Sequence, residues 1–464
     1  MLTRMRSAVS NMIGGIMASG GANEEKENDG GTNLPLRFQY SRPDFLGLCA
    51  DELQCFTDHI ARPILDLSES TRLPWSTGYA EVINAGKSAL NEDQACCEVV
   101  ELRKRPADPA SPNLYFHYWG LFDGHAGSGA AVFASKLLHL HIEEQLQSVL
   151  EILQKPSLQP PTCLAPGSPN TPTPRFFMEK KVKQESLVIG AIENAFKEMD
   201  KHIARERSVY DISGGCTALA VICLLGKLYV ANAGDSRAII LRSGEIIPMS
   251  SAFTPESERQ RLQCLAYMQP HLLGNEFTHL EFPRTVCKKE VGKRMLYRDY
   301  SMKGWAYKTV QEEDLKFPLV FGEGKKARVM ATIGVTRGFG DHDLQVHGTG
   351  ISIKPFLSCS PEVRVYNLEQ FEHGVDDVMI LATDGLWDVL SNKEVAEAVT
   401  SFLGNCDPDN HHRYTMAAQE LVMKARGVFT EQGWRTTNGR LGSGDDISVY
   451  IIPLIFGNSQ PQSR

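Results

Sequence analysis

The sequence lacks the marks of a secreted, membrane-spanning or disulfide-bonded protein. No apolar run reaches the 18 residues that would indicate a transmembrane helix, and the N-terminus alternates apolar and polar residues, unlike a signal peptide. The eleven cysteines are scattered and contain no CxxC pair. Cys96 and Cys97 are adjacent inside an apolar run, so we expect buried free thiols and a cytoplasmic or nuclear protein.

Basic charge and nucleotide-binding glycine motifs are also missing. The 464 residues carry 48 Lys and Arg against 56 Asp and Glu, a formal net charge of −8. Nucleic-acid binding needs a basic surface, so no nucleic-acid partner is expected, whereas this balance suits a soluble protein that binds cations. Neither GxGxxG nor GxxxxGKS/T occurs, which disfavours a nucleotide-binding enzyme. The length allows one large domain with insertions, or two to three ordinary ones.

Three segments interrupt the folded pattern. Residues 20–33 are rich in Gly, Glu and Asn and predict a flexible linker, and residues 104–113 predict a surface loop. Residues 155–175 contain seven prolines, too many for a helix or a central strand. This proline-rich insertion is either a disordered segment whose Ser-Pro and Thr-Pro pairs are phosphorylated or a loop tolerated outside the core.

Between the interruptions, strand and helix patterns alternate. Short β-branched or aromatic runs predict strands at 78–85, 94–100, 114–123, 217–225, 227–233, 377–383 and 446–453. Helical periodicity occurs at 130–153, 186–207, 391–403 and 414–427. Two antiparallel sets of strands with helices outside fit this order, and a doubly wound parallel sheet is the competing layout. We expect residues 226–241 to form a hairpin, which favours the antiparallel layout.

Acidic residues stand at the ends of four predicted strands. Asp123 and Asp384 follow apolar runs, while Asp445 and the pair Glu92–Asp93 precede them. Oxygen ligands select hard cations such as Mg²⁺ or Mn²⁺. Any single Asp-Gly pair is usually a simple turn, but four acidic strand ends beside long apolar runs favour a shared site. Carboxylates that converge in this way repel one another unless metal ions offset their charge.

Six ordered motifs carry a family resemblance. They are LFDGHAG (121–127), SGGCTAL (213–219), ANAGDSRA (231–238), VTRGFGD (335–341), LATDGLWDVL (381–390) and GSGDDISV (442–449). Together they resemble the 2C-type metal-dependent Ser/Thr protein phosphatases (the PPM family), closest to its H/J/M subgroup with H or J favoured. The resemblance implies an αββα sandwich, an α/β (α+β) fold of two antiparallel sheets flanked by helices. It also implies a catalytic domain over 34–455, between an N-terminal segment (1–33) and a C-terminal tail (456–464).

The same resemblance assigns metal ligands. It implies two divalent cations, Mg²⁺ or Mn²⁺, that activate a water for attack on phosphoserine or phosphothreonine. Asp123 bridges both cations, and Asp384 and Asp445 complete one site. Glu92 and the carbonyl of Gly124 serve the other.

Three further residues receive roles in the same way. Asp93 orders the waters at the cations, and Asp235 joins Asp384 in a weaker third metal site. His125 corresponds to the general acid that protonates the leaving serine or threonine oxygen. Without the resemblance, His125 would be a capping or core histidine, but its place directly after Asp123-Gly124 favours the catalytic role.

The sequence departs from the family pattern in two places near these motifs. The usual phosphate-binding arginine is replaced by Lys87 or Ser88, of which we favour Lys87, although a solvated strand-end lysine is the alternative. The last motif has Asp446 where Asn is usual. We expect this additional carboxylate to alter metal affinity.

A third departure is an enlarged flap over residues 262–327, a region that lies beside the catalytic cleft in the family. Its many aromatic residues favour a docking surface for a folded protein substrate, with a structural lobe packed on the sandwich as the alternative. The subgroup resemblance implies that the substrates are Rab-type small GTPases phosphorylated in their switch region.

Two rival functions are disfavoured. Cys97 to Arg103 matches the C-x5-R spacing of cysteine-based phosphatases, but it is strand-like, contains Glu98 and Glu101, and has no glycine nest for a phosphate. A pseudophosphatase that only binds would not need the intact acidic set and His125.

The first seventeen residues form an amphipathic pattern. On a helix, Leu2, Met5, Val9, Met12, Ile13 and Ile16 fall on one side. This pattern is typical of a helix in a membrane interface, which predicts peripheral contact with internal membranes. A mitochondrial transit peptide and a segment that docks on the catalytic domain are the alternatives.

Overall fold

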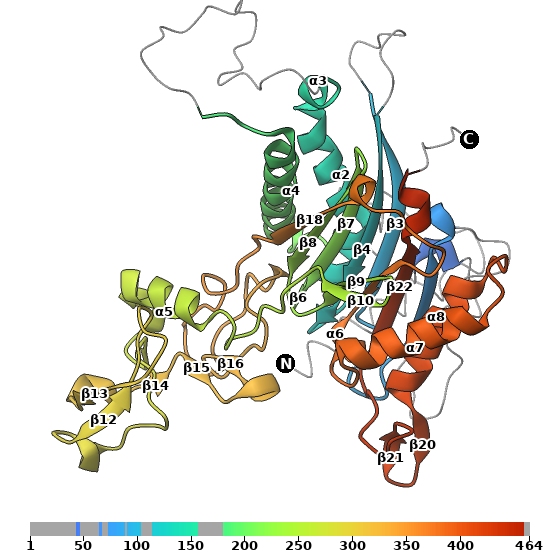
Figure 1. The fold of residues 1–464 in the computed structure, drawn as a ribbon. Coiled ribbons are helices and arrows are strands. Elements are labelled where there is room, and N and C mark those ends of the chain that lie inside the picture. The colour runs from blue at the N-terminus through green and yellow to red at the C-terminus, as the bar shows by residue number, and fades with distance from the viewer. Residues whose placement is uncertain are drawn as a thin grey trace, which may run out of the picture.

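The computed structural model describes residues 43–46, 65–66, 73–88, 91–103, 114–155 and 180–458. Within these residues, the core is a sandwich of a five-stranded and a six-stranded antiparallel sheet (Figure 1). The strand order is β18-β8-β7-β4-β3 in the first and β1-β2-β22-β19-β9-β10 in the second. The N-terminal segment 1–33, the loop 104–113 and the proline-rich insertion from residue 156 onward lie outside the described residues.

The strands of the sandwich coincide with the β-branched and aromatic runs of the sequence. The five-stranded sheet contains β3 (Gln94–Leu102), β4 (Leu114–Phe122), β7 (Ala218–Leu224), β8 (Lys227–Ala233) and β18 (Glu362–Asn367). The six-stranded sheet contains β1 (Leu65–Asp66), β2 (Gly78–Val82), β9 (Arg237–Arg242), β10 (Glu245–Pro248), β19 (Val378–Ala382) and β22 (Ile447–Pro453). A further small sheet joins β5 (Gly124–His125), β6 (Gly215–Cys216) and β17 (Phe339–Gly340).

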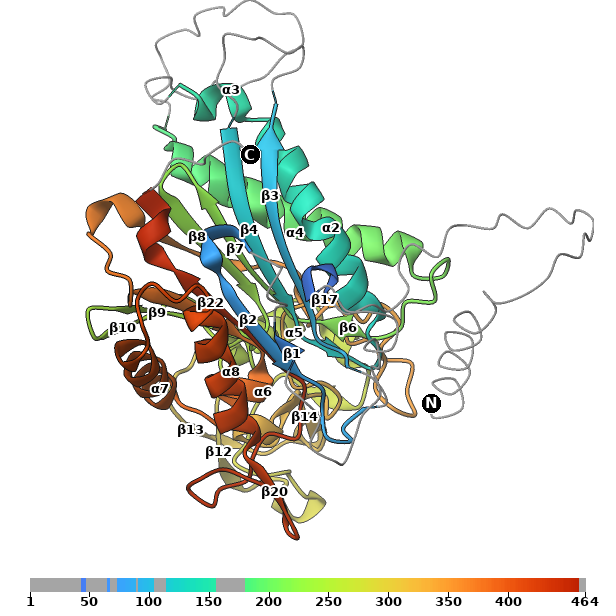
Figure 2. The same cartoon turned by 90° about the vertical axis from the view of Figure 1, so that its right-hand side faces the viewer.

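Long helices cover the outer faces of both sheets (Figure 2). On the five-stranded sheet lie α2 (Gly129–Gln147) and α4 (Gln184–Glu206), and α3 (Leu150–Leu153) follows α2. On the six-stranded sheet lie α6 (Asp384–Trp387), α7 (Asn392–Asn405) and α8 (Arg413–Arg426). The predicted αββα sandwich is therefore confirmed. In the described residues, no helix is both long and apolar enough to cross a bilayer.

The interior between the sheets is filled by large side chains. Tyr79 of β2 and Tyr450 of β22 are fully buried, with ring centroids 4.8 Å apart. Trp119 of β4 is also fully buried, and its indole N–H donates to the hydroxyl of Thr77 at 3.1 Å. Leu381 of β19 lies in the same cluster. Close packing of this layer fixes the spacing between the two sheets.

The predicted hairpin over residues 226–241 is wrong. β8 pairs with β7 and β18, whereas β9 pairs with β10 and β19, so the chain passes from one sheet to the other between them. Gly234 makes this crossing possible: its φ is +150°, and a Cβ there would lie 2.3 Å from Cβ of Thr217. Hydrophobic runs specify strands, but they do not specify which strand is the partner.

The expectation of buried thiols holds only in part. The described cysteines are all free, and Cys216 and Cys223 are buried, but Cys96 and Cys97 are only partly buried. The reason is their position on β3, which is an edge strand of the five-stranded sheet.

The flap forms a lobe that extends away from the sandwich (lower left in Figure 1). It contains α5 (Arg259–Met268), β11 (Phe277–Thr278), β12 (Arg294–Tyr297), β13 (Ala306–Thr309), β14 (Phe317–Pro318), β15 (Val320–Phe321) and β16 (Arg328–Val329). Its own buried cluster includes Leu262, Phe277, Met330 and Phe356. The lobe thus has a separate core to which residues beyond the predicted boundary at 327 contribute.

The remaining elements are short. A hairpin of β20 (Val428–Thr430) and β21 (Gly433–Arg435) follows α8. The 3-10 helices are η1 (Asp44–Leu46), η2 (Pro74–Ser76), η3 (Pro270–Leu273), η4 (Lys288–Glu290), η5 (Glu312–Asp314), η6 (Gly324–Lys326), η7 (Leu368–Gln370) and η8 (Leu454–Asn458).

The inter-sheet layer yields a stability prediction. Leu381→Ala should lower the free energy of unfolding by about 2–5 kcal/mol, because it leaves a cavity between the sheets. Leu140 is 41% exposed on α2, so Leu140→Ala should change the free energy of unfolding by less than about 0.5 kcal/mol. Urea denaturation of both variants measures the difference. Equal losses would contradict the described core.

Candidate metal-binding active site

The acidic strand ends meet at one end of the sandwich. β3 and β4 pair from Gln94↔Phe122 onward, so Glu92 and Asp93, which precede β3, lie beside Asp123, which follows β4. β19 and β22 are paired at Ala382↔Val449. This register brings Asp384, at the start of α6, close to Asp445.

Asp93 connects the two sheets at this point. Its side chain is 1% exposed, and Oδ2 accepts hydrogen bonds from the hydroxyls of Thr383 at 2.8 Å and Ser448 at 2.9 Å. Thr383 follows β19 and Ser448 belongs to β22, whereas Asp93 precedes β3 of the other sheet. The bonds therefore hold the carboxylate-bearing ends of both sheets together.

The carboxylates are close enough to oppose one another's ionisation. Burial, followed by the charges of Asp384, Asp93, Asp445 and Asp235, raises the pKa of Asp123 well above its usual value. Burial, then Asp235 and Asp445, raises the pKa of Asp384 to about 8. The pKa of Asp235 is raised to about 6, mainly by burial. Such a set is stable in the ionised form only with compensating positive charge.

The donor chemistry of the cluster suits a hard divalent cation. Carboxylate oxygens and a backbone carbonyl are the ligands that Mg²⁺ and Mn²⁺ prefer, and their mutual repulsion is what bound cations relieve. Among the described residues, however, no group of three His, Cys, Asp or Glu side chains is already arranged to hold an ion. The residues therefore fit such ions by their chemistry and convergence.

Glu92 and Gly124 lie against each other. A Cβ at Gly124 would be 2.4 Å from the carbonyl oxygen of Glu92, so only glycine permits this approach. Glu92 Oε1 accepts the amide N–H of Gly127 at 2.6 Å. Burial raises the pKa of Glu92, and the bond from Gly127 partly opposes that shift.

His125 is paired with Asp341, a residue to which the sequence analysis gave no role. His125 Nε2 lies 2.7 Å from Asp341 Oδ2, and the His125 side chain is 32% exposed. Burial lowers the pKa of His125, but the Asp341 carboxylate outweighs this effect, so the pKa is raised overall. Asp341 could have been identified as a candidate from the sequence, because it is the last residue of the VTRGFGD motif.

Lys87 lies at the carboxylate cluster. Its ammonium contacts the Asp445 carboxylate, and its side chain is 58% exposed. Burial lowers the pKa of Lys87, but Asp445 and Asp384 raise it above the usual value. Ser88, the alternative phosphate contact, instead accepts a hydrogen bond from Asn84 Nδ2 at 3.0 Å.

The effect of Asp446 on metal affinity stays a prediction, but the structure shows what its carboxylate binds. Its carboxylate accepts the backbone N–H groups of Asn84 at 2.7 Å and Glu92 at 3.1 Å, and the residue is 5% exposed. Burial raises its pKa to about 7. The structure thus uses Asp446 to hold the segment that carries Lys87 and Glu92, a contact across more than 350 residues that the sequence did not indicate.

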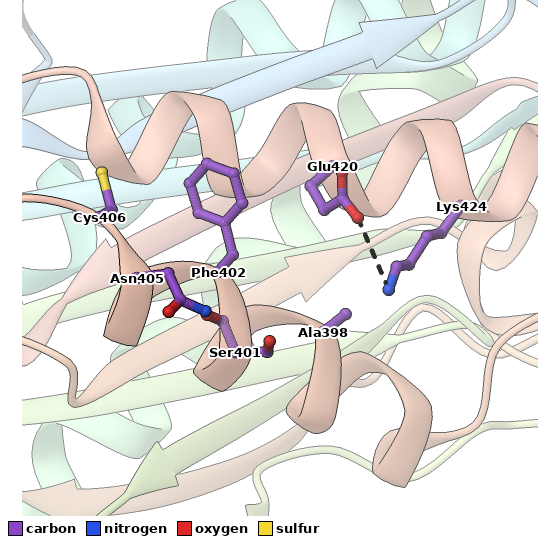
Figure 3. A pocket seen from close by; sticks show the side chains of 7 residues that line it. All are labelled: Ala398, Ser401, Phe402, Asn405, Cys406, Glu420 and Lys424. Atoms are coloured by element: carbon purple, nitrogen blue, oxygen red, sulfur yellow. Dashed lines mark hydrogen bonds and ion pairs between the residues drawn. The ribbon is translucent and has the colours of Figure 1, made fainter.

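A pocket of about 360 Å³ lies elsewhere, between α7 and α8 (Figure 3). It is lined by Ala398, Ser401, Phe402, Asn405, Cys406, Glu420 and Lys424. None of these residues belongs to the carboxylate cluster, so this pocket is not the candidate active site.

Comparisons with known proteins agree with this geometry. A family model described as protein phosphatase 2C matches residues 168–267 and 319–432, and the unmatched interval falls within the lobe, consistent with an insertion. Protein phosphatase 1H of Danio rerio is 69% identical, with both chains fully covered. Protein phosphatase 1H of Homo sapiens is 64% identical over 99% of each chain.

Protein phosphatase 1J of Homo sapiens is 59% identical over 91% of this chain and 87% of its own length. With such identity over nearly the whole chain, together with the ordered motifs and the αββα sandwich, this protein belongs to the protein phosphatase 2C family, in its H/J subgroup, and is a protein serine/threonine phosphatase.

Proposed function

We propose that this phosphatase hydrolyses phosphoserine and phosphothreonine in proteins with two divalent cations, Mg²⁺ or Mn²⁺. Asp123, Asp384 and Asp445 would hold one cation, and Asp123, Glu92 and the Gly124 carbonyl would hold the other. Asp235 with Asp384 supports a third, weaker site. The observation that carries the proposal is the convergence of partly buried, mutually repelling carboxylates from four strand ends.

Bound cations supply a reactive nucleophile from water at neutral pH and offset the charge of the phosphoryl group. The protein's own groups position the substrate and handle the proton. His125 Nε2 is engaged by Asp341, so Nδ1 is the ring nitrogen that donates a proton to the leaving oxygen. Asp341 favours the protonated ring that this step requires.

Lys87 is proposed to contact the phosphate. Its side chain is 58% exposed and its ammonium contacts Asp445, so a phosphate oxygen can take the place of Asp445 as its partner. A lysine acts there as a point charge, without the two-pronged grip of an arginine.

The first prediction from the proposed function concerns the acidic cluster. Asp123→Ala and Asp384→Ala should reduce Mn²⁺-dependent turnover of a phosphothreonine peptide by at least about 10²–10³-fold, since each removes a group that places positive charge at the reacting phosphate. Asp409→Ala, at an exposed position outside the cluster, is the control and should behave like wild type.

Calorimetric titration with Mn²⁺ provides the second readout for these variants. Both cluster variants should bind Mn²⁺ more weakly while circular dichroism shows an unchanged fold. A cluster variant with near wild-type rate and metal content would exclude the two-cation assignment. Wild-type turnover should also resist thiol alkylation, unlike that of a cysteine-based phosphatase.

We further propose that the flap binds the folded protein substrate. Several of its large side chains are exposed, at 49% for Tyr267, 70% for Met268, 60% for Tyr307 and 58% for Phe317. Residues 262–327 also contain eleven Lys and Arg against eight Asp and Glu, in a chain whose net charge is −8. Exposed aromatic and basic side chains are typical of binding surfaces.

The proposed substrates are Rab-type small GTPases phosphorylated in their switch region. This part rests on the subgroup resemblance. A flap with its own core supports it, because such a lobe presents a fixed surface to a folded protein beside the site.

The second prediction tests the flap. Trp305→Ala/Tyr307→Ala should spare hydrolysis of a small aryl phosphate but lower kcat/KM for a phosphorylated Rab protein by about tenfold or more, because remote contacts supply binding energy. Phe429→Ala, which removes an equally exposed aromatic ring from the β20–β21 hairpin, is the matched control. Equal losses on both substrates would indicate a structural lobe instead.

The N-terminal amphipathic segment, residues 1–17, is proposed to bind membranes peripherally. Its apolar side would enter the interface, and the Gly/Glu-rich linker would allow the catalytic domain to reach membrane-bound substrates. These residues lie outside the described part of the chain. The support is therefore the sequence pattern alone.

The third prediction tests this anchoring with small anionic liposomes. Full-length protein should float with the vesicles, and Val9→Asp/Ile13→Asp should abolish flotation because it places charge on the apolar side. Ser10→Asp/Asn11→Asp adds the same charge to the polar side and should retain more binding. If wild type stays at the bottom, or if both variants float equally, the anchoring proposal is wrong.

A further inference from the structure

The partner of His125 lies in a turn with unusual backbone geometry. Gly340 has φ +81° and Asp341 has φ +56°, a left-handed conformation that is strained for a residue with a side chain. Such a conformation persists only where the surroundings hold it. The identity of the groups that hold this turn is therefore informative.

Asp200 of α4 and Lys354 bind the backbone of this turn. Asp200 Oδ1 accepts the amide N–H of Gly340 at 3.0 Å and the Lys354 ammonium at 2.9 Å. The same ammonium donates to the Gly340 carbonyl at 2.8 Å, so both backbone groups of Gly340 are held by one ion pair. His342 Nε2 also lies 3.2 Å from Asp200 Oδ1.

This ion pair is largely shielded from water. Asp200 is 6% exposed, and the Lys354 side chain is 18% exposed. Burial alone would raise the pKa of Asp200, but His342 and Lys354 lower it below the usual value. The carboxylate is therefore ionised, and its bonds to the turn are charge-assisted and stronger than neutral ones.

The position of the turn determines the position of His125. β17, which ends at Gly340, pairs with β6, and β6 pairs with β5, which carries His125. Asp341 N–H donates to the Gly214 carbonyl at 2.7 Å. A Cβ at Gly215 would lie 2.3 Å from Asp341 Oδ2, so the carboxylate packs directly against the backbone of Gly215. A shift of Gly340 would therefore move Asp341 Oδ2 relative to the imidazole.

We propose that Asp200 and Lys354 are positioning residues for the proton-donation step: they clamp the Gly340–Asp341 turn so that Asp341 holds His125 in the orientation that protonates the leaving oxygen. The inference rests on the proposed role of His125 as general acid. The contacts of Asp200 and Lys354 are with Gly340 and His342, next to Asp341, so they act on His125 through the turn and its partner Asp341.

The leaving group separates this role from a structural one. The alkoxide that leaves phosphothreonine is a poor leaving group and needs a proton, whereas the phenolate of p-nitrophenyl phosphate leaves readily without one. A well-placed general acid contributes roughly 10²–10⁴-fold, and a misplacement of about 1 Å can cost about 10²-fold. A positioning defect should therefore lower kcat for the peptide and spare the aryl phosphate.

The experiment compares kcat for a phosphothreonine peptide and p-nitrophenyl phosphate at saturating Mn²⁺ in the full-length enzyme. Lys354→Met should lose about tenfold or more on the peptide and less than about threefold on the aryl phosphate. Lys354→Arg should recover most of the peptide rate. Arg207→Ala is the matched control, because it removes a surface ion pair to Asp343 (3.0 Å), two residues from Asp341, and should leave both rates unchanged.

The same comparison in His125→Ala distinguishes the two levels of the proposal. If His125→Ala loses equally on both substrates, the general-acid role fails. If it loses selectively while Lys354→Met loses equally on both, or on neither, the positioning role fails. Adding Lys354→Met to His125→Ala should cause no further loss, because both act on one step.

Asp200→Asn provides a second variant should Lys354→Met fail to fold. It keeps an oxygen that can accept the Gly340 N–H but removes the charge that holds Lys354. The same selective loss on the peptide is expected. A rate equal to that of wild type on both substrates would overturn the proposal.

Discussion

Repulsion among partly buried carboxylates is the constraint on which the rest of the structure depends. Asp123, Asp235 and Asp384 are brought to one end of the sandwich by strands of both sheets, and each is held at a raised pKa. The hydrogen bonds from Thr383 and Ser448 to Asp93 keep the sheet ends together against this repulsion. The negative charge of such a cluster has to be offset by positive charge. Lys87 offsets part of it, and divalent cations can offset the rest.

Supporting contacts around the cluster come from distant parts of the chain. Asp446 fixes the segment from Asn84 to Glu92, and Asp341 fixes His125. The flap has a core of its own, so its surface is not required for packing of the sandwich. Under the proposed function, substrate binding by the flap and phosphate chemistry at the carboxylates therefore depend on different residues.

Much of the fold follows from local pattern. The helices at 392–405 and 413–426 and the strands at 94–102 and 447–453 were predictable because apolar periodicity and strand-end acidic residues are local signals. The failed hairpin at 226–241 shows the limit, since a strand's partner depends on the whole sheet. The contacts of Asp446, Asp341 and Asp200 join residues more than 100 positions apart, which single-sequence patterns do not encode. The roles of the site residues were inferred from family resemblance. The structure shows in addition that these residues lie close together.

The central claim is that the strand-end carboxylates form one centre for divalent cations. Anomalous diffraction at the manganese edge, from crystals of the full-length protein grown with Mn²⁺, tests it most directly. We expect two strong peaks beside Asp123, with Asp384 and Asp445 around one peak and Glu92 and the Gly124 carbonyl around the other. Manganese bound elsewhere in a catalytically active crystal, with none at Asp123, would contradict it.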